Sequence, residues 1–160
     1  MSTLVGAELE AVRVFTERAA AELIRSGFPR VPAGVLMALT GSRQGRLSAA
    51  ELRAVLQVSA AAISSAVGYL DQIGMITIST VPGTRRHSYF VGEDPWFTRI
   101  AATDTYRRSA DAIRTAVLEL PPASAGARRA GEMADFLTFC ADRVPDLVQE
   151  WLAARSGNAD

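Results

Sequence analysis

The sequence has no lysine, and it has only one cysteine and one histidine among its 160 residues. A lone cysteine, Cys140, excludes an intrachain disulfide and is typical of a protein that folds in the reducing cytoplasm. One histidine and one cysteine are also too few for the usual zinc sites. The sequence therefore predicts neither a metal site nor a cofactor.

Long apolar runs and enzyme motifs are missing as well. No run approaches the roughly 20 apolar residues that a membrane-spanning helix needs, and no basic segment followed by an apolar core marks a signal peptide. Neither a glycine-rich phosphate loop nor the Gly-x-Ser-x-Gly or His-Glu-x-x-His pattern occurs. We therefore expect a cytoplasmic protein that has no membrane partner and is not an enzyme.

The composition that is present is ordinary for a folded globular protein, with 49% hydrophobic and 21% charged residues. All 17 basic residues are arginines, matched by 17 acidic residues. Arginine and alanine are so abundant that they indicate a compositional bias, and the number of arginines alone is weak evidence for a nucleic-acid partner. The segment from Thr40 to Val91 is nevertheless basic, while its flanks are mildly acidic. A local basic surface on a neutral protein is compatible with DNA binding.

The N-terminal part of the chain has the pattern of two helices. Residues 6–26 place apolar side chains three and four positions apart, and Gly27 is a natural stop. Pro29 and Pro32 are expected to break the chain before a second helix, which covers residues 35–39 and ends at Gly41.

Two short helices follow, each with a clear N-terminal signal. Ser48 and Glu51 form a capping box for a helix over residues 49–56. After a turn at Gln57 and Val58, Ser59 caps a second helix. Its apolar stripe contains Ile63, Val67 and Leu70, and Gly74 ends it.

A β-hairpin is predicted next, with strands at residues 75–80 and 87–91. Its loop, residues 81–86, carries Arg85 and Arg86. Arg46 and Leu47 form a short extended segment earlier in the chain. Two short helices followed by a basic hairpin are typical of a winged helix-turn-helix.

The C-terminal part is predicted to be helical again. One helix runs from Pro95 to about Leu120, and a second covers residues 123–154, with Pro145 as a point where it can kink. The second helix has large apolar residues on more than one side, as expected when a helix faces both its own chain and a partner. An ordinary intrachain bundle is the alternative. We expect a mainly α fold with a small β-hairpin wing, in which a DNA-binding lobe (30–92) is flanked by a helical dimerisation lobe (1–29 and 93–160).

The helix that Ser59 caps is the candidate DNA-reading element, because the major groove admits a helix and small side chains let its backbone approach the bases. Arg85 and Arg86 are placed to meet the adjacent minor groove or its phosphates. A small-residue face can also simply pack against another helix, and arginines on a hairpin can simply be solvated. The candidate DNA-binding residues are Ser59, Ala60, Ala61, Ala62, Ser64, Ser65, Tyr69, Arg85 and Arg86.

Four motifs in this region match a known family in order and spacing: Ser48-Ala-Ala-Glu-Leu52, Ser59-x-x-x-Ile63-Ser64, Leu70-x-x-x-Gly74-Met75-Ile76 and Gly83-Thr-Arg-Arg-His-Ser-Tyr-Phe90. The chain resembles the MarR superfamily of winged-helix transcriptional regulators, particularly its GbsR-like branch. Two positions depart from the family pattern. Ser65 stands where many members have arginine, and the wing Pro82-Gly-Thr-Arg-Arg86 lacks the aspartate found in many members.

The resemblance implies a homodimer whose terminal helices intertwine, and which places two recognition helices about 34 Å apart on a pseudo-palindromic operator in double-stranded DNA. It also implies a small-molecule effector bound between the two lobes. Phe15, Trp96, Phe97 and Tyr106 are the candidates for that pocket, or else core aromatics. The expected function is a sequence-specific DNA-binding regulator, most simply a repressor. The alternative is a winged-helix module that binds another protein and not DNA.

Two further residues have chemistry of their own. His87 lies beside Arg86 in the wing, where a phosphate contact or plain exposure is expected. Cys140 lies among Phe136, Phe139 and Val144 in the sequence, which favours a buried structural thiol over a redox switch.

Overall fold

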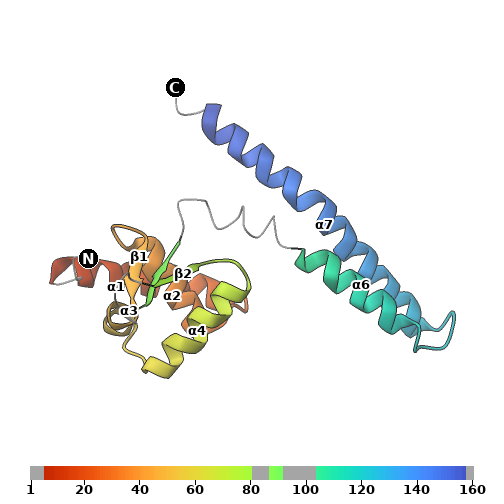
Figure 1. The fold of residues 1–160 in the computed structure, drawn as a ribbon, viewed down its shortest axis with the longest axis horizontal. Coiled ribbons are helices and arrows are strands. Elements are labelled where there is room, and N and C mark those ends of the chain that lie inside the picture. Colours follow the sequence, from red (N-terminus) through yellow and green to blue (C-terminus); the bar gives the residue numbers. More distant parts are fainter. Residues whose placement is uncertain (1–5, 81–86, 92–103, 158–160) are drawn as a thin grey trace. The chain divides into compact units, whose positions relative to one another are not determined.

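A computed structural model describes residues 6–80, 87–91 and 104–157 of the chain (Figure 1). The chain divides into two compact units, Met1–Trp96 and Phe97–Asp160. In their described parts, the first unit contains four helices and a small sheet, and the second contains two helices. The described residues are mostly helical, as the sequence predicts.

The first unit begins with helix α1 (Ala7–Arg25), which agrees with the predicted helix within one residue at each end. Gly27 has a φ of 96°, and it allows the Phe28 amide to donate to the Leu23 carbonyl at 2.9 Å. The left-handed backbone at Gly27 ends the helix, and glycine is the residue that adopts this conformation most easily. Helix α1 packs against α2 and α3 of the same unit.

Helix α2 (Arg30–Gly41) starts five residues earlier than predicted. Pro32 does not break the chain before it but occupies the third position of the helix. The first amides of a helix have no intrahelical partner, so a proline there costs no hydrogen bond. Pro29 supplies the extended residue before the helix, with φ −61° and ψ 136°.

The helix-turn-helix consists of α3 (Ala49–Leu56) and α4 (Ala60–Gln72). The capping box predicted at Ser48 is confirmed, because its hydroxyl accepts from the Glu51 amide while the Glu51 carboxylate accepts from the Ser48 amide at 2.7 Å. Helix α4 ends at a glycine stop. Gly74 has a φ of 77°, and the Met75 amide donates to the Leu70 carbonyl at 2.8 Å. Because Met75 completes this stop, the next strand begins at Thr77 and not at Met75.

The sheet has three antiparallel strands in the order β1-β3-β2. Strands β2 (Thr77–Thr80) and β3 (His87–Phe90) form the predicted hairpin. Strand β1 (Arg46–Ser48) pairs with β3, so that the short extended segment becomes a third strand. This combination of helices and sheet is a winged helix-turn-helix.

The core of the first unit is formed by aliphatic side chains from its helices and from β1. Residues of α2, α3, α4 and the sheet are fully buried in one cluster, which Val12 of α1 also joins. The largest of them are Leu39, Leu47, Leu52, Ile63, Leu70 and Ile76.

The second unit is an antiparallel pair of helices, α6 (Thr105–Val117) and α7 (Ala125–Gly157). Arg107 donates to Asp142 at 2.6 Å and Arg114 donates to Asp135 at 3.0 Å, two turns apart on each helix. The Ser124 hydroxyl accepts from the Ala127 amide at the start of α7. Helix α6 ends three residues before the predicted Leu120, and its predicted start at Pro95 lies outside the described residues. Pro145 lies inside α7, which continues through it.

No single described helix is long and apolar enough to cross a membrane. Helices α3 and α4 would pass such a test only as a pair, and they are bent by 109° at their junction.

Candidate DNA-binding interface

Helix α4 is held in place by the turn before it and by its own cap. Gln57 has a left-handed backbone, with φ 54° and ψ 40°, which ends α3 and redirects the chain. The Ser59 hydroxyl then accepts from the Ala62 amide at 3.1 Å, so the predicted cap is confirmed. This bond satisfies one of the amides at the start of the helix that have no partner within it.

One side of α4 is buried and the other is open. Ile63, Ala66, Val67 and Leu70 are buried in the core of the first unit. The opposite side, which we call the small-residue face, is exposed in the described part of the unit and contains Ala60, Ala61, Ser64, Ser65 and Gly68.

The small-residue face is therefore not an intrachain helix contact within the first unit. A Cβ placed on Gly68 would have no atom within 4 Å. Ala62 is half-buried at the edge of this face. Because the side chains on this face are small and exposed, a partner molecule has room to approach the helix backbone closely.

Tyr69 lies at one edge of the small-residue face. Its ring lies 6.0 Å from that of Phe28, nearly edge-on at 75°, and the residue is 37% exposed. The contact with Phe28 limits the directions in which the ring can turn. The phenol group is thus presented in a restricted position beside the small residues.

Arg46 is an exposed cation that the sequence pattern did not single out. Its guanidinium stacks over the Phe90 ring at 4.5 Å and donates to Ser79 at 3.3 Å. The register of β1 and β3 places Arg46 opposite Phe90, so the stacking follows from strand pairing. The sequence predicts an extended segment at Arg46–Leu47. The pairing of this segment with the hairpin, which brings Arg46 to Phe90, is seen only in the folded chain.

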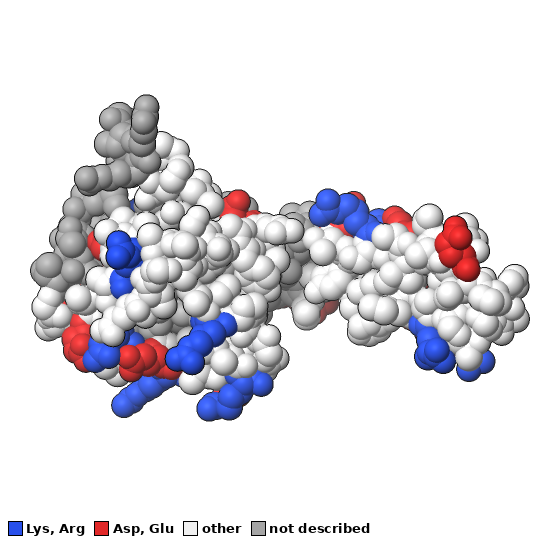
Figure 2. Space-filling model, turned by 90° about the horizontal axis from the view of Figure 1, so that it is seen from below, with Lys and Arg blue, Asp and Glu red and all other residues white. Residues whose placement is uncertain are grey.

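The remaining predicted DNA-binding residues, Arg85 and Arg86, lie outside the described residues. His87 begins β3 and is exposed. On the face shown in Figure 2, charged side chains lie mainly toward the margins and most of the surface between them is uncharged.

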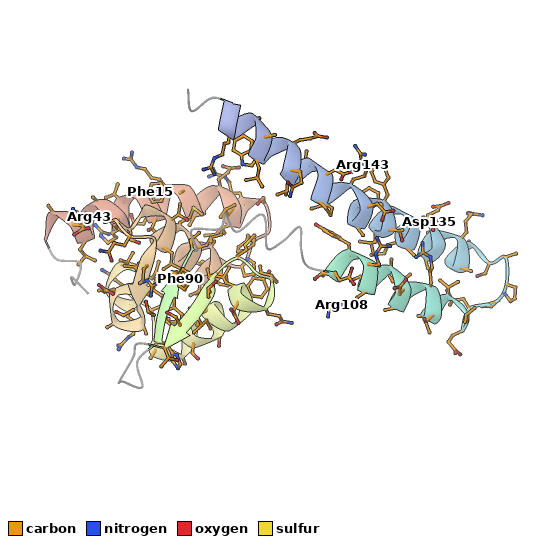
Figure 3. All side chains as sticks on the ribbon, turned by 45° about the horizontal axis from the view of Figure 1, so that its top comes forward. Phe15, Arg43, Phe90, Arg108, Asp135 and Arg143 are labelled. Atoms are coloured by element: carbon orange, nitrogen blue, oxygen red, sulfur yellow. The ribbon has the colours of Figure 1, made fainter. Side chains whose placement is uncertain are left out.

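The four residues predicted for an effector pocket are not brought together by the described structure. Trp96 and Phe97 lie outside the described residues, while Phe15 and Tyr106 belong to different units. Phe15 is 42% exposed and lies against the end of α2, where a Cβ on Gly41 would be 2.5 Å from its ring (Figure 3). The pocket between the lobes stays a prediction.

Cys140 does not lie in the buried cluster that its sequence neighbours favoured. It is half-buried, while Phe136 and Phe139 are 64% and 60% exposed. The thiol is therefore not enclosed in an aromatic core within the described part of this unit.

Both units match models of one protein family. Residues 26–87 match the model described as MarR family, and residues 94–154 match the model described as MmpR5-like MarR family transcriptional regulator. A search of the curated proteins gives no match.

A solved structure described as a transcriptional regulator is similar to the chain with a TM-score of 0.68 and 24% identity, over 89% of this chain and 98% of the other. At this identity the likeness shows the fold. The two family models cover separate, adjacent parts of the chain and agree on the family. Residues 26–87 and 94–154 are thus each similar to MarR-family transcriptional regulators.

Proposed function

We propose that the protein is a sequence-specific DNA-binding repressor that acts as a homodimer. The observation that carries this proposal is the open small-residue face of α4, seated on a rigid core directly after the helix-turn-helix turn. The similarity of two parts of the chain to MarR-family models supports the DNA-binding role.

Helix α4 fits the major groove by size and by surface. Alanine methyl groups can contact thymine methyl groups, and the hydroxyls of Ser64 and Ser65 can donate to or accept from several bases. The free amides at the start of the helix favour a nearby phosphate. The small-residue face has no arginine, asparagine or glutamine for a bidentate contact with a base. We therefore expect modest direct reading of bases, with selectivity added by Arg85 and Arg86 and by the spacing of two half-sites.

The homodimer is supported by the apolar residues that α7 leaves exposed. One side of α7 contains the buried residues Ala134 and Val148. A second side, which we call the outer α7 face, contains Met133, Phe136, Phe139, Leu147 and Trp151, each more than half exposed.

Helix α1 likewise exposes an apolar strip, over Ala11, Val14 and Phe15. Large apolar patches on a folded protein are typical of subunit interfaces. A two-fold arrangement of such faces would present two copies of α4 about 34 Å apart on the DNA. The effector site at Phe15, Trp96, Phe97 and Tyr106 belongs to the same proposal.

The test is selection of bound duplexes from a random pool, followed by titration of the selected site at several salt concentrations. Ser64→Glu places a carboxylate on the small-residue face, and we expect affinity to fall about 100-fold because like charges in a binding interface cost several kcal/mol. Gln149→Glu, an exposed position on α7, adds the same charge and should leave affinity unchanged.

If no duplex is selected and none binds at low salt, DNA binding is ruled out and the protein-interaction module becomes the better reading. The wing is tested separately with the Arg85→Ala, Arg86→Ala double variant. It should weaken binding to every duplex and reduce the salt slope by about 0.9 for each lost phosphate contact. Repression is tested by deleting the gene and measuring transcription next to the selected site, which should rise.

A further inference from the structure

The side chain of Arg46 reaches across the small sheet. Strand β3 lies between β1, which carries Arg46, and β2, which carries Ser79. The guanidinium stacks on the Phe90 ring of β3 at 4.5 Å and donates to the Ser79 hydroxyl of β2 at 3.3 Å (Phe90 is labelled in Figure 3). One side chain thus links all three strands. We call this set of contacts the Arg46 clasp.

Strand pairing brings the three residues of the clasp to one face of the sheet. Arg46 is opposite Phe90, and Ser79 is opposite Ser88, two residues before Phe90. Because side chains along a strand alternate between the two faces, Arg46, Phe90 and Ser79 share a face. Ser79 is nearer to the hairpin loop than Phe90 is, so the arginine side chain runs diagonally across the central strand toward the loop.

Strand β1 is joined directly to the helix-turn-helix. Ser48 is the last residue of β1 and also the N-cap of α3, where it forms the capping box with Glu51. Leu47, between Arg46 and this cap, is 1% exposed and belongs to the core. Strand β1 therefore cannot shift without disturbing α3. A contact from β1 to β2 and β3 fixes the hairpin relative to the helix-turn-helix.

The clasp depends on the shape of arginine and not only on its charge. A planar guanidinium stacks on a ring while its N–H groups bond to other partners, and a lysine ammonium is a compact point charge that cannot stack in this way. Arg107 and Arg114, by contrast, bond to carboxylates. Exposed cation–π stacking and a neutral hydrogen bond each change an equilibrium by about 2–5-fold, so the whole clasp is worth about 10-fold.

We propose that Arg46 is a positioning residue for the wing, because its clasp holds the hairpin of β2 and β3 at a fixed orientation to α4. The hairpin and α4 then meet one DNA duplex together. This role in DNA binding rests on the proposed function, whereas the clasp itself is a property of the protein alone. Arg46 acts through the hairpin and not through a DNA contact of its own.

Hydrogen exchange of the full-length protein, followed by mass spectrometry, tests the clasp without DNA. Arg46→Ala should speed exchange in residues 77–80 and 87–90 about 10-fold and leave α4 unchanged. Arg43→Ala removes the same charge from an exposed position three residues earlier and should change neither region. Unchanged exchange in the hairpin of Arg46→Ala would overturn the clasp. Equally faster exchange in α4 would show that Arg46 supports the whole unit and is not a positioning residue.

Titration of the selected duplex separates positioning from a direct phosphate contact. Arg46→Ala and Arg46→Lys should both weaken binding, by about 5–10-fold, because lysine keeps the charge but loses the stacking. Phe90→Leu changes no charge and should weaken binding by a similar factor. Binding of Arg46→Lys at the affinity of the wild type would assign Arg46 to a phosphate contact and would overturn the positioning role.

The Arg85→Ala, Arg86→Ala double variant supplies the second background. Adding Arg46→Ala to it should weaken binding no further, because the wing side chains that the clasp serves are already absent. An equal loss in both backgrounds would contradict the proposal. If the wild type binds no duplex at low salt, the proposed function fails and the exchange result on the clasp still stands. If the wild type binds and Arg46→Ala binds equally well, only this inference fails.

Discussion

The two units differ in how they bury apolar surface. The first closes a core in which side chains such as Leu39, Leu52 and Leu70 have no exposed area. In the described part of the second, the buried apolar residues are Ala110, Ala134 and Val148, two of which are alanines. The larger residues of α7 are instead on its outer face. The buried core therefore stabilises the first unit without a partner. In the second unit, the large apolar side chains of the outer α7 face remain exposed to solvent.

This difference fits the two proposed tasks of the protein, DNA reading by the first unit and assembly through the second. A reading helix must be held rigidly, and α4 gains that rigidity from a core that needs no partner. An antiparallel pair of helices with a thin contact gains stability when another apolar surface covers it, and that stability then depends on protein concentration. We therefore expect the first unit to behave as a folded module and the second to depend on assembly.

The largest effect is expected from charges on the outer α7 face. The double variant Phe136→Glu, Leu147→Glu should raise the dimer dissociation constant at least about 1,000-fold. Burial of each such side chain contributes about 1.5–3 kcal/mol, and two-fold symmetry repeats every loss. Sedimentation velocity over a range of concentrations measures the change, and unfolding of α7 should become easier at the same time.

The matched control is Gln149→Glu, which adds a charge to α7 away from that face. It should leave the dissociation constant unchanged. A double variant that sediments as the wild type does would show that the outer α7 face is not the subunit interface.

The next largest effect belongs to the core of the first unit. Leu70→Ala should lower the free energy of unfolding of this unit by about 2–5 kcal/mol, because it leaves a cavity under α4. Hydrogen exchange followed by mass spectrometry should show faster exchange in α2, α3 and α4 at every protein concentration. Gln72→Ala, exposed on the same helix, should have little effect. If α7 lost protection equally, the two units would not be independent.

The sequence predicted the local structure of the first unit well where a signal is contained in a few adjacent residues. The bounds of α3 and the caps at Ser48 and Ser59 depend on side chains that bond to amides three positions away. Helix α2 was predicted too short because Pro32 was read as a breaker, although the first turn of a helix tolerates proline.

Features that depend on distant segments were not predictable in the same way. The third strand, β1, and the stacking of Arg46 on Phe90 exist only because Arg46 is paired with a residue 44 positions later. The small-residue face of α4 was predictable, since helical periodicity alone separates Ile63 and Val67 from Ser64 and Ser65.

The smallest expected effect concerns the exposed ion pairs that join α6 to α7. Arg114 donates to Asp135 at 3.0 Å, and both side chains are exposed, Asp135 more than Arg114. A double-mutant cycle with Arg114→Ala and Asp135→Ala should give a coupling of about 0–1 kcal/mol that declines with added salt, as for other surface pairs.

The salt dependence of this coupling free energy shows whether the Arg114–Asp135 pair is exposed in the assembled protein. If both side chains stay exposed to solvent in the assembled protein, the coupling free energy remains small and added salt weakens it. A coupling well above 1 kcal/mol that persists in high salt would mean that assembly buries this edge of the helix pair, and that the subunit interface extends beyond the outer α7 face.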